Sequence, residues 1–122
     1  MGRINRYDIH EGFAHSGIVR AGDFVFLSYC VGNVGGTVKE QINGAFDDME
    51  RRLRIVGLEL SDVVKIDCLF RDVWDIPAME QIIRERFPGN YPARKSIQTN
   101  FAHKGGEKGL KFQVDGIAYC GK

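Results

Sequence analysis

The sequence lacks any hydrophobic run long enough to span a membrane, and it lacks an excess of charge of one sign. Its longest apolar stretches are strand-sized, whereas a membrane span needs about 20 consecutive apolar residues. Lys plus Arg total 17 and Asp plus Glu total 16, which leaves a formal net charge of +1. A broad nucleic-acid footprint needs a basic surface. We therefore expect neither a membrane nor a nucleic acid as a partner.

Targeting signals and cysteine pairs are also lacking. The N-terminus has no apolar signal-peptide region, and Arg6 stands where N-myristoylation needs Ser or Thr. The only cysteines are Cys30, Cys68 and Cys120, which are far apart and form no C-x-x-C pair. Neither a disulfide framework nor a local zinc site is predicted. We expect reduced thiols in a cytoplasmic protein.

What is present fits one compact α+β domain over residues 1–122, with 43% hydrophobic and 27% charged residues. Apolar runs on both sides of Gly22-Asp23 predict a hairpin within residues 16–30. Thr37 is the expected N-cap of an amphipathic helix that ends near Gly57. Gly44 inside this helix costs about 1 kcal/mol relative to Ala unless close packing or function requires it. The remaining expected elements are a strand over 61–70, a helix from Asp75 to about Phe87, and strands over 94–102 and 110–120 separated by the polar stretch 103–109.

The order β-β-α-β-α-β-β predicts a mixed sheet with both helices on one face. On the last strand Gln113 and Asp115 alternate with apolar residues that should face the helices. The opposite face is expected to mix polar groups with Val25, Leu27 and Ile117. Such a face is too apolar to be left in water and too polar for a plain core, so we expect subunit association with a pocket between subunits.

Arg94 follows Tyr91-Pro92-Ala93 at the start of a predicted strand. The proline stiffens the entry, and a guanidinium presents a planar fork that binds a carboxylate through two parallel hydrogen bonds. An ordinary surface ion pair explains the same pattern equally well. The residues alone leave both alternatives open: an anchor for a small acid, or an ion pair.

Four segments resemble the RidA/YjgF family, also called the L-PSP endoribonuclease-like family. They are Pro92-Ala93-Arg94, an opening hairpin over 15–28, a middle strand over 63–72 and a closing strand over 111–118. The resemblance covers nearly the whole chain. It implies a chorismate-mutase-like subunit in a homotrimer, with the sheets forming a barrel and ligand clefts between subunits. It also implies hydrolysis of reactive enamines and imines, such as 2-aminoacrylate, to 2-keto acids and ammonia, with no metal or organic cofactor.

The resemblance assigns roles to single residues. Arg94 matches the arginine that binds the substrate carboxylate, and Ser96 matches a position, often cysteine, whose backbone contacts the ligand. Gln113 stands where deaminating members have a glutamate that activates water. An amide binds water but does not accept its proton at accessible pH. Asp115, on the same face of the strand, is the nearby candidate for a base, and a structural ion pair is its alternative role.

The opening hairpin departs from the family pattern in two places. His15 stands where the family often has tyrosine, and Ser28-Tyr29-Cys30 replaces an S-G-Q turn. His15 is a candidate proton donor near neutral pH, or simply a hydrogen-bonding residue. Tyr29 is expected to stack in the ligand cleft or to fill the trimer interface. Ser28 is a further candidate ligand contact.

Two functions therefore remain open at this point. One is an enamine/imine deaminase with Arg94 as anchor and with Gln113, assisted by Asp115 or His15, orienting water. The other, motivated by Gln113, is a non-catalytic small-carboxylate binding or regulatory protein of the same fold. RNA cleavage, which the family label suggests, is disfavoured because the charge is near neutral and no aromatic and basic platform is evident.

Overall fold

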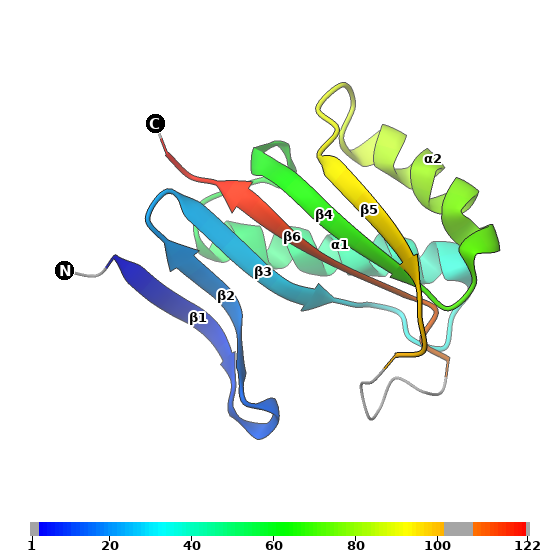
Figure 1. Ribbon diagram of the computed structural model, residues 1–122, viewed down its shortest axis with the longest axis horizontal. Helices are drawn as coiled ribbons and strands as arrows, with labels where there is room; N and C mark the ends of the chain where they lie inside the picture. The colour runs from blue at the N-terminus through cyan, green and yellow to red at the C-terminus, as the bar shows by residue number, and fades with distance from the viewer. Residues whose placement is uncertain (1–2, 102–108, 122) are drawn as a thin grey trace.

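The computed structural model describes residues 3–101 and 109–121, and it has the expected α+β architecture with one mixed sheet (Figure 1). The sheet has six strands in the order β1-β2-β3-β6-β4-β5. Strands β4 and β5 are parallel, and the other neighbours are antiparallel. The strands and α-helices are β1 (Ile4–His10), β2 (His15–Ala21), β3 (Phe24–Cys30), α1 (Val38–Ile55), β4 (Val63–Phe70), α2 (Ile76–Arg86), β5 (Ala93–Gln98) and β6 (Phe112–Tyr119).

Both helices cover the same face of the sheet, as expected, and α1 crosses behind the central strands in Figure 1. The core between them is built on four aromatic side chains, of which Phe46 comes from α1 and Phe112 from β6. Phe46 lies edge-on to Phe87 with 5.6 Å between ring centroids, a favourable aromatic geometry. Phe70 of β4 completes the group against Phe112 at 5.2 Å. These contacts fix the helices to the centre of the sheet.

The hairpin and the first helix form where the sequence predicts them. Gly22 adopts φ +60 in the β2–β3 turn, a left-handed conformation that glycine tolerates best. Thr37 accepts a hydrogen bond from the Glu40 amide, and the Glu40 carboxylate accepts one from the Thr37 amide, which forms a capping box. Gly57, with φ +75, follows the end of α1. The predictions for Gly22, Thr37 and Gly57 are confirmed.

Strand β1 was absent from the predicted order, and the structure adds it at the edge beside β2. Most of its side chains are exposed, and Asn5, Arg6, Asp8 and His10 are polar, so no alternation marks it as a strand. Its strand geometry comes from antiparallel pairing with β2, in which Tyr7 lies opposite Ile18. The strand conformation of residues 4–10 therefore depends on backbone pairing with β2, and the side-chain pattern gives no sign of it.

The second half of the chain needs two corrections. The Asp75 side chain makes no capping hydrogen bond; instead Asp72 accepts one from the Trp74 amide in the short 3-10 helix Val73–Asp75 that leads into α2. Strand β5 ends at Gln98 rather than at residue 102. Residue 102 and most of the predicted polar stretch 103–109 lie outside the described residues.

The two faces of the sheet are clearest on β6, whose burial alternates strictly. Phe112, Val114 and Ala118 are fully buried toward the helices, as predicted. We call the other side of the sheet the open face. On strands β3, β4, β5 and β6, the residues of the open face include Phe24, Phe26, Leu69, Ile97, Gln113, Asp115, Ile117 and Tyr119.

The prediction for β3 had the wrong phase. Val25 and Leu27 are buried in the helix-side core, and Phe24 and Phe26, each 43% exposed, lie on the open face instead. Both faces of β3 carry apolar residues, so alternation of polarity could not decide which set faces the helices. The mixed apolar and polar character expected of the open face is nevertheless present.

Gly44 is explained by the close approach of two backbones. A Cβ atom built at Gly44 would lie 2.8 Å from the carbonyl carbon of Gly32, closer than real Cβ contacts allow. Gly32 belongs to the segment that leaves β3 for α1. Glycine at position 44 therefore lets α1 lie directly against the end of β3.

We expect Gly44→Ala to lower the free energy of unfolding by about 1–3 kcal/mol, because the added methyl group overpacks this contact. Alanine in an unconstrained helix would instead stabilise by about 1 kcal/mol. Chemical denaturation measures the difference, and Lys39→Ala on the exposed side of α1 is the control. A more stable Gly44→Ala protein would contradict the packing explanation.

Candidate functional site

Arg94 lies on β5 and points toward α2. It is in register with Ile66 of β4, which is fully buried on the helix side. Its Nη1 donates to Ser96 Oγ at 2.8 Å, and its Nη2 donates to Glu80 Oε2 of α2 at 3.3 Å. The Arg94 and Glu80 side chains are 32% and 38% exposed, so this ion pair contributes little to stability and a ligand carboxylate can replace it. The surface ion pair, one of the two roles considered for Arg94, is therefore present in this structure. Its presence does not exclude the other role, an anchor for a small acid.

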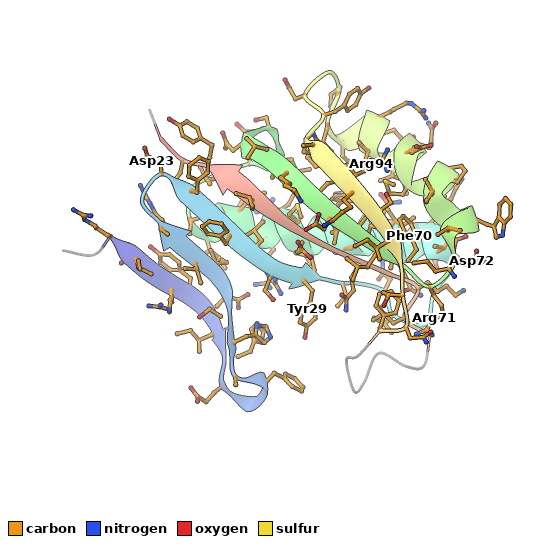
Figure 2. All side chains as sticks on the ribbon, viewed as in Figure 1. Asp23, Tyr29, Phe70, Arg71, Asp72 and Arg94 are labelled. Atoms are coloured by element: carbon orange, nitrogen blue, oxygen red, sulfur yellow. The ribbon has the colours of Figure 1, made fainter. Side chains whose placement is uncertain are left out.

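A hollow of about 370 Å³ lies beside Arg94, which is within the size range of small-molecule sites. Figure 2 shows Arg94 at the side of the molecule where β5 lies next to α2. The hollow is lined by Glu80, Ile83, Arg84, Tyr91, Pro92 and Arg94. Two arginines, one glutamate and the rings of Tyr91 and Pro92 thus border a space of suitable size for a small acid.

Gln113 and Asp115 lie on the open face. Gln113 is in register with Leu69 of β4, and Leu69 is in register with Ile97 of β5. Neighbours in register point to the same side of a sheet, so this row is separate from the row that contains Arg94 and Ile66. One subunit therefore carries Arg94 with Ser96 on one face and Gln113 with Asp115 on the other.

Ser28 and Tyr29 form a bulge in β3 opposite Asp115. Leu27 pairs with Gly116 and Cys30 pairs with Val114, so two residues on β3 face one on β6. His15 of β2 contacts both of them: its Nδ1 is 3.4 Å from Ser28 Oγ, and its ring centroid is 5.5 Å from that of Tyr29. The structure brings together these three predicted residues, and the bulge residues Ser28 and Tyr29 lie opposite Asp115.

Two residues that support this bulge did not stand out in the sequence. His10 of β1 stacks on His15 with 5.0 Å between ring centroids. Arg52 of α1 is only 5% exposed and donates to the backbone oxygens of Ser28 and Tyr29 at 3.0 and 2.9 Å. The signal for Arg52 was its spacing, three residues after Met49 and four before Val56, which places a cation within the apolar stripe of the helix.

Asp67 is a third residue of this arrangement that did not stand out in the sequence. It lies directly opposite Asp115 in the antiparallel β4–β6 pair. Burial, the Asp67 charge and a hydrogen bond with Asp67 raise the pKa of Asp115 to about 6. A hydrogen bond from Lys65 Nζ, at 2.6 Å from Asp67 Oδ1, holds the pKa of Asp67 below its usual value. Asp115 is therefore the carboxyl that keeps a proton to higher pH.

The cysteines offer no reactive thiol to this arrangement. Cys30 supports the bulge, since its Sγ donates to the Ser28 backbone oxygen at 3.5 Å and accepts from Arg52 Nη1 at 3.7 Å. Cys30 and Cys68 are fully buried free thiols, and burial raises the pKa of each to about 12, which makes them unreactive. Cys120 is also free. Among residues 3–101 and 109–121 no group of three or more His, Cys, Asp or Glu side chains is arranged to hold a metal ion. In the same residues no helix has the length and apolar character that crossing a membrane requires.

The sequence is similar to those of one known protein family. The family model described as Endoribonuclease L-PSP matches residues 7–120. A 2-iminobutanoate/2-iminopropanoate deaminase of Dermatophagoides farinae is 30% identical over 90 residues, which cover 68% of this chain and 70% of that protein. The mitochondrial protein mmf2 of Schizosaccharomyces pombe is 28% identical, with 94% of both chains covered.

Solved structures agree. A YjgF family protein of Streptococcus pyogenes has 66% identity and a TM-score of 0.92, with 98% of both chains covered. A YjgF family member of Neisseria meningitidis has 22% identity and a TM-score of 0.85 over 98% of this chain and 96% of that one, which is a likeness of fold alone.

The Asp67–Asp115 pair predicts an unusual dependence of stability on pH. A carboxyl whose pKa is higher in the folded than in the unfolded protein stabilises the fold at low pH, and this stabilisation is lost as pH rises through about 6. We expect Asp115→Asn to raise the melting temperature at pH 8 relative to the native protein, with a difference that shrinks as the pH falls through about 6 toward 4. Thermal unfolding from pH 4 to pH 8 tests this.

Asp23→Asn, on the exposed β2–β3 turn, is the matched control for this measurement and should show no such pH-dependent gain. A loss of stability in Asp115→Asn that is equal at all pH values would contradict the repulsion between the two carboxyls.

Proposed function

Because this chain belongs to the endoribonuclease L-PSP (YjgF) family, we propose that it hydrolyses small imines or enamines that carry a carboxylate, releasing 2-keto acids and ammonia. Curated relatives that are about 30% identical are named 2-iminobutanoate/2-iminopropanoate deaminases, which supports this reaction at the level of the family. The observation that carries the proposal is Arg94, whose guanidinium borders a hollow of about 370 Å³ and is held there by one exposed ion pair.

The reaction requires more than one subunit. Arg94 and Gln113 lie on opposite faces of one sheet, so a single chain cannot present both to a substrate of a few atoms. The open face carries exposed Phe24, Phe26 and Tyr119, an apolar area suited to association. We propose that a homotrimer forms through this face and completes each site with the open face of a neighbouring copy.

In the proposed site each residue has a separate task. Arg94 binds the substrate carboxylate by charge-assisted hydrogen bonds, and Ser96, already bonded to it, keeps the guanidinium in place. The Gln113 amide accepts a hydrogen bond from the attacking water and so orients it, but it takes no proton. Asp115 or His15 must therefore act as the base. His15 and Tyr29 form the wall beside Asp115 together with Ser28.

A second function rests on Gln113 alone. Without a glutamate at this position, the protein would bind small carboxylates through Arg94 and turn over none of them. Like the deaminase function, this non-catalytic or regulatory function predicts that Arg94 binds the ligand carboxylate. Unlike the deaminase function, it predicts that no keto acid or ammonia is released.

Replacing the proposed anchor distinguishes specific catalysis from background hydrolysis. We expect the protein to accelerate release of ammonia from freshly generated 2-iminopropanoate, and Arg94→Ala to lower kcat/KM by about 10- to 100-fold because charged hydrogen bonds to the carboxylate are lost. Keto-acid formation, timed against the spontaneous rate, measures this. Arg54→Ala at the exposed end of α1 is the control; an unchanged rate in Arg94→Ala would exclude this arginine as the anchor.

Restoring a carboxylate at position 113 separates the two functions. In a deaminase with competent geometry, Gln113→Glu should raise kcat by about tenfold or more, since a positioned general base contributes typically a hundredfold or more. If neither form accelerates hydrolysis while both bind pyruvate in isothermal titration, and Arg94→Ala does not bind, the binding function is the correct one.

A further inference from the structure

Two carboxyl groups face each other across the central strands on the open face. Asp67 of β4 and Asp115 of β6 are cross-strand partners. Side chains in such positions have Cβ atoms about 5 Å apart, and like charges placed there destabilise a sheet. Two ionised carboxylates in these positions repel each other, and a hydrogen bond between them requires that one of them holds a proton.

Charged groups on neighbouring strands balance the pair. Lys65 of β4 donates to Asp67, and Lys95 of β5 is in register with Asp67 on the same face. From β3 the neighbours are uncharged, because Ser28 and Tyr29 of the bulge lie opposite Asp115. His15 of β2 contacts the same bulge. From α1, Arg52 donates to the backbone of the bulge, and the buried apolar residues of β6 face the helix. Lys65 binds Asp67 directly, so Asp115 is the member of the pair that carries the proton.

We propose that Asp67 and Asp115 share one proton and form the acid–base group of the site, with Asp115 as the catalytic residue and Asp67 as the residue that positions and tunes it. This rests on the proposed deaminase function. The proton transfer then belongs to the Asp67–Asp115 pair, whose Asp115 lies two residues after Gln113 on β6. Gln113 only orients the water.

The positions along β6 support this division. Gln113 and Asp115 are two residues apart on one face, which separates them by roughly 6 to 7 Å. A water molecule that donates to the Gln113 amide oxygen can reach the Asp115 carboxylate with its other hydrogen. Asp115 is half-buried beside the bulge that Arg52 holds from the other side, so its surroundings are fixed. A base of pKa near 6 is also better matched to neutral pH than an ordinary aspartate.

The chemical step balances without any further reagent. Water attacks the carbon of the protonated imine, the C–O bond forms as the C=N π bond breaks, and the Asp115 carboxylate takes the released proton. The product is a carbinolamine. Asp115 then returns this proton to the nitrogen, ammonia leaves as the C–N bond breaks, and the hydroxyl proton passes to the carboxylate and on to solvent or ammonia.

The pH dependence of kcat/KM for 2-iminopropanoate tests the pair, with the spontaneous rate subtracted at each pH. The native protein should lose activity on the acid side with an inflection near pH 6. Asp67→Asn removes a neighbouring negative charge, so the inflection should fall by about one pH unit. Lys95→Gln removes a positive charge and should move the inflection upward.

Asp115→Asn should lose about 100-fold at pH 8 and lack the inflection. Asp67→Ser replaces Asp67→Asn if the latter does not fold, and Asp23→Asn is the control that should match the native profile. A structural role for Asp67 would change the rate at all pH values equally and would leave the inflection in place. The two opposite shifts are therefore specific to tuning of Asp115.

The outcomes separate this inference from the proposed function. Native acceleration that is lost in Arg94→Ala but kept in Asp115→Asn at pH 8 overturns the acid–base role and leaves the deaminase function standing. Absence of acceleration by the native protein at every pH overturns both. In that case a carbon-13 NMR titration of the aspartate carboxyls, without substrate, tests proton sharing by itself. Proton sharing is excluded if Asp115 titrates below pH 5 and does so identically in the native protein and in Asp67→Asn.

Discussion

Strand β6 lies between β3 and β4, and its strict alternation determines what each side of the molecule can do. Phe112, Val114 and Ala118 fill the core beneath α1, and this fixes the strand so that Gln113 and Asp115 must face the other way. A shift of one residue would exchange the two sets and destroy both core and site. The position of the functional groups is thus a consequence of the hydrophobic packing on the opposite face.

The buried guanidinium of Arg52 is the second constraint. A buried cation is costly unless it is paired and fully hydrogen-bonded. Arg52 meets most of this requirement by donating to the Ser28 and Tyr29 backbone oxygens and by pairing with Asp48 and with Asp8 of β1. Its Nε lies 3.3 Å from Asp8 Oδ2 in the ion pair but makes no hydrogen bond. It thereby connects α1, the β3 bulge and the edge strand β1. The bulge beside Asp115 is stabilised from within the core.

The sequence was informative where one local signal acted alone. The capping residues of α1, the glycine of the β2–β3 turn and the alternation of β6 were all predicted correctly, because each depends on neighbours along the chain. The phase of β3 was wrong since both of its faces are apolar. Strand β1 escaped detection because it forms through backbone pairing with β2 and has little apolar pattern.

The candidate site was predicted in part for the same reason. Arg94, Gln113 and His15 stood out through their local motifs and the family resemblance. Arg52 and Asp67 did not, because their importance depends on residues that are distant in the sequence: Arg52 on the β3 backbone, and Asp67 on its partner across β4 and β6. Cross-strand register cannot be deduced from a strand considered by itself.

In the proposed mechanism, orientation of water and removal of its proton belong to two residues where a single glutamate would do both. An amide at position 113 is uncharged, so it can lie beside Asp115 without adding a third negative charge to the Asp67–Asp115 pair. A glutamate there would repel Asp115 and raise its pKa further. The pair in turn supplies the proton acceptor that the glutamine lacks. Because Arg94 lies on the other face of the sheet, the proposed site is complete only in the proposed assembly of subunits. The proposed catalysis and the proposed assembly therefore depend on the same open face.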